Sequence, residues 1–183
     1  LMKIFSILSL IKKIPKTSWS SKKPLNIKPK IKTLIFLIIG LFLFGLGETL
    51  LLASGGGISP WTVLAEGLSI YTSYSIGWCT FWVSLSVLIL WIPLKQKPGI
   101  GTILNAIIIA VVLDFALPYL PNPENYGYKI LQIVIGVLIT GLGSGFYLIA
   151  NLGPGPRDGL MTGVQRLTGK PIALVRSTIE VIV

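Results

Sequence analysis

Residues 33–53 read TLIFLIIGLFLFGLGETLLLA, an apolar run in which Glu48 is the one charged residue. A helix needs about 20 such residues to cross a bilayer core about 30 Å thick. Three more runs of this character lie at 74–94, 101–120 and 129–150, and a fifth begins at Pro171 and continues to Val183. These runs predict an all-α, polytopic helical membrane protein.

The composition agrees with this class and excludes others. The 183 residues are 52% hydrophobic and only 12% charged, whereas a soluble domain carries roughly 25% charged residues. Histidine is absent, so the chain has no histidine metal ligand, general base or catalytic triad. Cys79 is the one cysteine, and no paired-carboxylate motif stands out. We therefore expect a protein that is not an enzyme and has no catalytic residue, metal or cofactor.

The loops between the runs alternate in charge. Residues 1–32 hold nine lysines and no acid, and the connections 95–100 and 151–170 are also basic. The connections 54–73 and 121–128 contain no lysine or arginine. Because basic loops stay in the cytoplasm, this alternation predicts a multi-pass protein with a cytoplasmic N-terminus.

The basic tail, residues 1–32, has an apolar beginning. Ile4, Phe5, Leu8 and Ile11 fall on one helical face, which favours an interfacial helix. Next to a membrane domain, the lysines are expected to contact anionic lipid rather than nucleic acid.

The sequence repeats itself after a shift of 96 residues without a gap. Pro60 then falls on Pro156, and GLG at 45–47 falls on GLG at 141–143. Further glycines come into register: Gly40, Gly57 and Gly67 with Gly136, Gly153 and Gly163. Three spans separate the copies, so the two units are expected to cross the membrane in opposite directions. Inverted-topology repeats of this kind are common in secondary transporters.

Each copy follows its Gly-rich span with a break and a short amphipathic segment, at 58–70 and at 156–168. Proline stands at the first helical position in both segments, which is its preferred place in a helix. Both segments are too short to cross a bilayer. They are either interfacial connectors or re-entrant half-helices with positive ends directed at an anion.

The repeat also predicts a division of the chain. Residues 1–32 form the tail, 33–121 form a first membrane repeat with three spans, and 128–183 form a second repeat with one full span and a shorter one. The fifth span has about thirteen residues, or roughly 20 Å at 1.5 Å per residue, and its equivalent in the first repeat is followed by a third span. We therefore expect the chain to be C-terminally incomplete.

The segments SPWTVLAEGLS and LGPGPRDGLMTGVQRLTGKPIALVRSTIE resemble the YczE/YyaS group of bacterial integral membrane proteins, which is related more loosely to the YitT family. The resemblance covers residues 33–183. It implies a plasma-membrane protein of bacteria with five or six spans. The group supplies no catalytic or binding residues to transfer.

Polar groups inside spans are costly, so they are candidates for function. The candidates for a substrate or ion pathway are Asp114, Glu48, Asn105, Glu180 and Arg176, with Asp114 as the first choice. The alternative is that the acids pair with Arg176 or serve as structural glue. Arg157, in the second short segment, is a candidate for an anionic substrate or lipid headgroup, although it also satisfies the positive-inside rule alone.

These features favour a small permease or secondary-transporter-like protein in the bacterial plasma membrane that moves an unidentified small solute. The alternative is a non-transporting membrane protein that regulates or scaffolds a partner.

The predicted topology can be tested by cysteine labelling in a chain whose native Cys79 is replaced. A cysteine at position 124 should react with an impermeant reagent added outside cells, and one at position 96 should react only from inside. The reverse pattern contradicts the predicted orientation.

Overall fold

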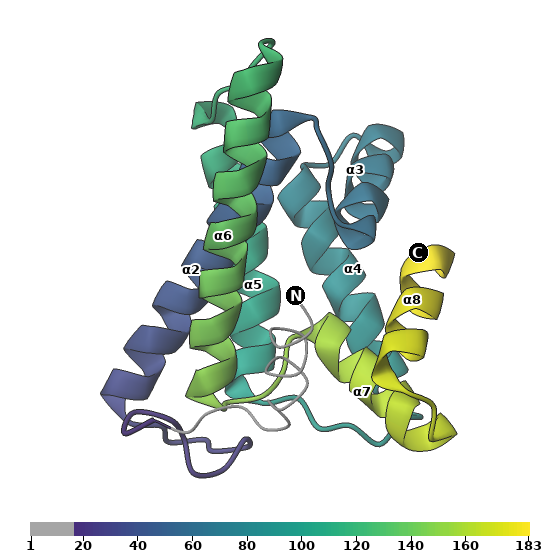
Figure 1. The fold of residues 1–183 in the computed structure, drawn as a ribbon. Coiled ribbons are helices and arrows are strands. Elements are labelled where there is room, and N and C mark those ends of the chain that lie inside the picture. Colours follow the sequence, from purple (N-terminus) through teal and green to yellow (C-terminus); the bar gives the residue numbers. More distant parts are fainter. Residues whose placement is uncertain (1–16) are drawn as a thin grey trace, which may run out of the picture.

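The computed structural model describes residues 17–183. The interfacial helix expected in the tail lies outside the described residues. Within 17–183 every regular element is a helix, and this confirms the predicted all-α class (Figure 1). The elements in order are α2 (Ile31–Ser54), α3 (Pro60–Thr72), α4 (Ile76–Leu90), α5 (Ile100–Ala116), the short 3-10 helix η1 (Leu117–Tyr119), α6 (Tyr126–Ala150), α7 (Pro156–Thr168) and α8 (Ile172–Ile182).

Three of these elements are long and apolar enough to cross a membrane: α2, α5 with η1, and α6. The expected span at 74–94 is shorter than predicted, because α4 ends at Leu90 and the chain turns over residues 91–95. Pro93 accounts for this end, since proline disfavours helical geometry at the residue before it. The pair α3 and α4 counts as a fourth span only when taken together, and these two helices are bent by 117° at their junction.

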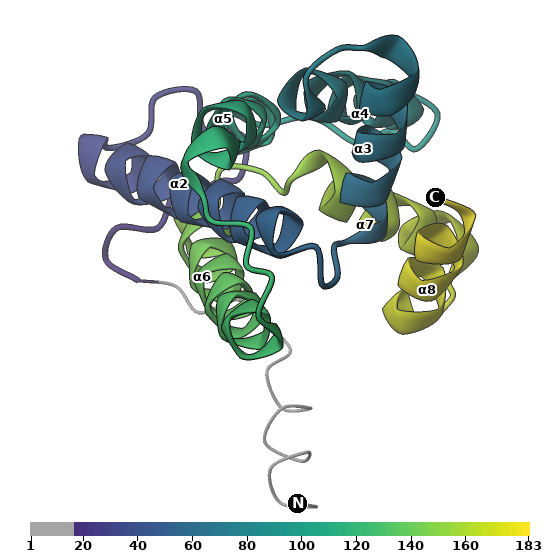
Figure 2. The same cartoon turned by 90° about the horizontal axis from the view of Figure 1, so that it is seen from above.

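The helices form two groups that lie side by side when seen from above (Figure 2). The three-helix group consists of α2, α5 and α6, and the four-helix group consists of α3, α4, α7 and α8. Contacts between α4 and α5 join the groups.

The three-helix group depends on a close approach of α2 and α6. A Cβ atom added at Gly40 would lie 2.7 Å from the backbone nitrogen of Tyr147 and 3.0 Å from the carbonyl oxygen of Gly143. A Cβ atom at Gly47 would lie 2.8 Å from the carbonyl oxygen of Gly136. The helices are therefore antiparallel and in near backbone contact, a geometry that only small residues permit.

The short helices α3 and α7 both begin deep in the molecule. The helix α3 then runs towards the end of the molecule where α2 ends, and α7 runs towards the end where α6 ends (Figure 1). Ser59, before α3, bonds Glu48 inside α2 rather than a residue at the end of that helix. Gly155, before α7, lies against Asn105 inside α5. Both short segments therefore fold back into the molecule, and their place relative to the bilayer stays a prediction.

Backbone and side-chain hydrogen bonds fix the chain that leads into α7. The Leu152 carbonyl accepts from the Gly101 N–H at 2.8 Å, and the Pro154 carbonyl accepts from the Thr102 hydroxyl at 2.7 Å. The indole N–H of Trp91 donates to the Pro156 carbonyl at 3.0 Å. These three bonds set the position of the α7 N-terminus against α4 and α5.

The glycine contacts predict opposite effects for two alanine substitutions. Gly40→Ala places a methyl group against the α6 backbone, so we expect it to destabilise the fold by about 1–3 kcal/mol. Gly141→Ala is the matched control, because a Cβ atom there meets nothing within 4 Å and alanine favours a helix by up to about 1 kcal/mol. Thermal unfolding of the purified proteins in detergent measures both. Equal midpoints for the two variants would contradict the close approach.

Candidate functional site

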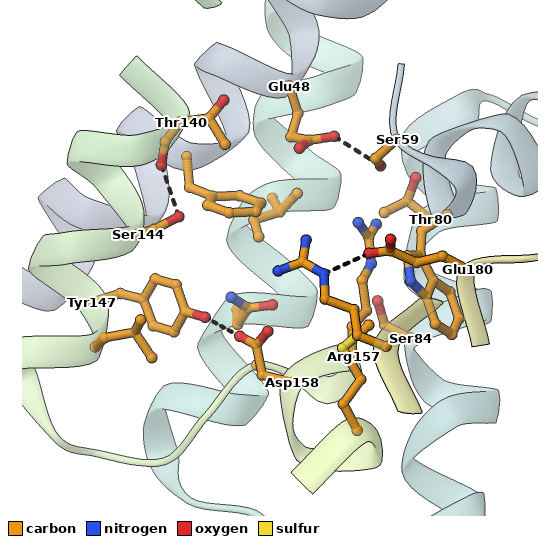
Figure 3. Close-up of a pocket in the computed structure, with 18 residues that line it drawn as sticks. Glu48, Ser59, Thr80, Ser84, Thr140, Ser144, Tyr147, Arg157, Asp158 and Glu180 are labelled. Atoms are coloured by element: carbon orange, nitrogen blue, oxygen red, sulfur yellow. Dashed lines mark hydrogen bonds and ion pairs between the residues drawn. The ribbon is translucent and has the colours of Figure 1, made fainter. Parts of the chain in front are cut away.

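A cavity of about 330 Å³ lies between the three-helix group and the four-helix group (Figure 3). Side chains from each of the seven α-helices of residues 17–183 line it, and α3 and α7 reach it with their first turns. Its charged lining residues are Glu48, Arg157, Asp158, Arg176 and Glu180. A mostly apolar cavity between helices with a few polar groups directed into it is the usual form of a small-molecule site.

Glu48 is a buried carboxylate that joins α2 to α3. Its Oε2 atom accepts hydrogen bonds from the Thr62 hydroxyl at 2.9 Å and the Ser59 hydroxyl at 3.3 Å. The side chain is only 6% exposed. The two hydroxyls offset part of the cost of burying the acid, and both bonds use the same oxygen.

Asp158 makes the corresponding link between α7 and α6. The Tyr147 hydroxyl donates a hydrogen bond to its Oδ2 atom (Figure 3). Asp158 also lies in the first turn of α7, where a negative charge interacts favourably with the positive end of the helix dipole. Each short helix is thus tied to a long helix through one carboxylate.

Arg157 extends from the first turn of α7 and lies against the Trp61 ring, with its guanidinium carbon 5.7 Å from the ring centroid. Within residues 17–183 it forms no ion pair within 4 Å and no side-chain hydrogen bond. Burial lowers the pKa of the guanidinium, and the carboxylates of Glu48 and Asp158 oppose this effect. Arginine stays charged in proteins, so the cavity contains a cation without a direct partner in this part of the chain.

Arg176 and Glu180 on α8 form the ion pair that the sequence suggested as the structural alternative. The Arg176 Nε atom donates to the Glu180 Oε1 atom at 2.8 Å. The Arg176 side chain is 65% exposed, so the pair contributes little to stability. Glu48 does not join this pair among the interactions of residues 17–183.

Asp114, the first choice from the sequence, is not part of the cavity lining. Its Oδ2 atom accepts from the Ser75 hydroxyl at 2.6 Å, and its Oδ1 atom accepts from the Gly77 N–H at 2.7 Å. It therefore closes the N-terminus of α4, where backbone N–H groups lack partners within the helix. The other five candidates, Glu48, Asn105, Arg157, Arg176 and Glu180, do line the cavity.

Five lining residues were not among the candidates chosen from the sequence: Trp61, Thr80, Ser84, Tyr147 and Asp158. The 96-residue shift contained a signal for three of them. Trp61, Thr80 and Ser84 correspond to Arg157, Arg176 and Glu180, and all six line the cavity. Three further pairs at this spacing also line it: Phe44 with Thr140, Glu48 with Ser144, and Ser59 with Gly155.

The position of Asp114 predicts a structural effect. Asp114→Ala removes two hydrogen bonds at the α4 N-terminus, so we expect a loss of about 1–2 kcal/mol of stability. Glu124→Ala, at an exposed carboxylate in a loop, is the matched control and should leave the unfolding midpoint unchanged. Midpoints that fall equally in both variants would contradict the capping role.

Comparison with known proteins places these features in a family. Residues 31–183 match DUF6198, a family of unknown function. The chain is 39% identical over 171 residues to an uncharacterized protein of Haemophilus influenzae, covering 93% of this chain and 78% of that protein. It is 33% identical over 147 residues to the uncharacterized membrane protein YczE of Bacillus subtilis (79% and 68%) and 28% identical to YyaS of the same organism (77% and 72%). No solved structure matches significantly. The chain is therefore a polytopic helical membrane protein that belongs to the DUF6198 family.

Proposed function

We propose that this protein is a small permease of the bacterial plasma membrane, with the cavity as its solute site. The observation that carries the proposal is the position of the cavity. It lies between residues that correspond at the 96-residue spacing, so both copies of the repeat contribute equivalent positions to one polar site.

The proposal includes an inverted repeat, and the helix boundaries support it. The helices α3 (Pro60–Thr72) and α7 (Pro156–Thr168) each have 13 residues and begin and end at corresponding positions. The glycine contacts are reciprocal. Gly40 meets Gly143 and Gly47 meets Gly136, although by sequence Gly40 corresponds to Gly136 and Gly47 to Gly143. Such an exchange of partners is what a two-fold axis between antiparallel helices requires.

Alternating access is the mechanism that suits this arrangement. The cavity lies between the two helix groups, so rocking of the four-helix group against the three-helix group would expose it to one side at a time. The proposed orientation has the N-terminus inside, because the basic connections 95–100 and 151–170 then both face the cytoplasm.

Glu48 is the proposed coupling residue for a proton. Acidic residues within spanning helices are rare and are common members of proton pathways, and Glu48 lines the cavity. The Oε1 atom, which accepts neither of the hydroxyl bonds, is the position for that proton.

Transport measurements in proteoliposomes test the proposal. The full chain is reconstituted with a proton-sensitive dye inside, and a panel of small organic acids, amino acids and sugars is added outside. At least one solute should drive a pH change that Glu48→Gln reduces to the level of empty liposomes, because glutamine keeps a carbonyl acceptor for Thr62 but cannot take up the proton. Glu66→Gln, at an acid outside the cavity lining, is the matched control and should retain the signal.

Two results would contradict the proposal. One is the absence of any flux, measured by dye or by radiolabelled solute, from a correctly inserted protein. The other is an equal loss of flux in Glu48→Gln and Glu66→Gln. The first result would favour the non-transporting alternative.

A further inference from the structure

We infer that the cavity binds a small solute through a monoanionic oxygen group, such as a carboxylate, on the guanidinium of Arg157. This inference rests on the proposed function and names the chemical class of the solute. Three independent features of the described residues carry it.

The first feature is the unpartnered cation. The Arg157 guanidinium has five N–H donors and no acceptor atom. Within residues 17–183, no acceptor is hydrogen-bonded to it. The cation–π contact with the Trp61 ring, 5.7 Å from the guanidinium carbon to the ring centroid, provides no acceptor for its N–H groups. The edge of the guanidinium is the part that pairs with the two oxygens of a carboxylate.

The second feature is a buried donor beside this cation. The Trp61 side chain is 5% exposed, and its indole N–H has no hydrogen-bond partner among the described residues. Trp61 lines the same cavity as Arg157. A buried donor without an acceptor is costly, and a ligand with acceptor oxygens removes that cost.

The third feature is the convergence of two helix N-termini on the cavity. Ser59 and Gly155, the residues before α3 and α7, both line it. The start of α3 is capped by the Ser59 side chain and faces Glu48. The N-terminal cap residue of α7 is Gly155, which has no side chain to cap the helix. The positive end of α7 lies beside Arg157, which extends from the same turn, and Asp158 in that turn offsets part of the helix dipole.

The carboxylates in the lining limit the charge of the ligand. Glu48, Asp158 and Glu180 carry three negative charges against the two positive charges of Arg157 and Arg176. Glu180 is paired with Arg176, so Glu48 and Asp158 remain beside Arg157 and repel a dianion more strongly than a monoanion. At roughly 30 Å³ per water molecule, the cavity has room for a ligand of about ten water volumes. A small ligand with one negative charge is therefore favoured over one with two.

Isothermal titration calorimetry with sodium acetate tests the inference on the full chain in phosphatidylcholine nanodiscs. The wild-type protein should bind acetate more tightly than sulfate and should not bind choline. Arg157→Gln should weaken acetate binding about ten- to hundredfold, the loss expected for a charge-assisted bidentate contact. Arg157→Lys keeps the charge without the fork and should weaken it less.

Two further variants serve as the comparison. Trp61→Phe keeps the ring under the guanidinium and removes the N–H, so it should weaken acetate binding severalfold. Arg166→Gln, at an exposed arginine in the last turn of α7, should bind acetate as the wild type does. The unfolding midpoint of each variant reports whether that variant folds. If Arg157→Gln does not fold, acetate binding by Arg157→Lys supplies the test.

The outcomes separate this inference from the proposed function. Unchanged acetate binding in both Arg157 variants, or preference for sulfate or choline, overturns the inference even if another solute is transported. Acetate binding that depends on Arg157 supports the inference even if no flux is found. In a second arm, phosphatidylglycerol replaces part of the phosphatidylcholine in the nanodiscs. If this lipid binds through Arg157 and acetate does not, the oxygen group belongs to a lipid headgroup, and the inference of a small solute is overturned.

Discussion

The structure is built around the close contact between α2 and α6. The two backbones approach at Gly40 and Gly143 and again at Gly47 and Gly136, about two helical turns away. Lipid provides no hydrophobic force between helices, so such contact must come from close van der Waals packing of small residues. This contact places Glu48 on α2 and Tyr147 on α6 along one side of the pair, where both line the cavity.

The folded-back helices then complete the site. Glu48 holds the start of α3 through Thr62 and Ser59, and Tyr147 holds the start of α7 through Asp158. Each bond joins a long helix to a short one at depth, so the two carboxylates have a structural role as well as a charge. Arg157 differs from them, because it is the charged lining residue to which no partner within residues 17–183 is bonded. That difference makes it the group most available to a ligand.

Several site residues could be selected from the sequence because a polar group in a long apolar run is rare. Glu48, Asn105, Arg176 and Glu180 stand out for this reason, and all line the cavity. The same rule selected Asp114, which caps α4 instead. Its partner Ser75 is 39 residues away along the chain, and helical periodicity gives no information about which distant helix end an acid will meet. Tyr147 was missed because a tyrosine near the end of a span is also typical of an interfacial anchor.

The helical membrane class, the approximate places of the long helices and the 96-residue correspondence could all be predicted from the amino-acid sequence alone. These depend on the length of apolar runs and on local glycine and proline spacing, which are visible along one chain. The packed structure was needed to show that α3 and α7 fold back, that α4 stops at Leu90, and which polar side chains share a cavity. The depth at which a short helix begins, and the side chains that it turns to the cavity, depend on bonds between separate helices, such as Glu48 with Thr62 and Tyr147 with Asp158. Such bonds form only after the helices have packed, so no single segment encodes them.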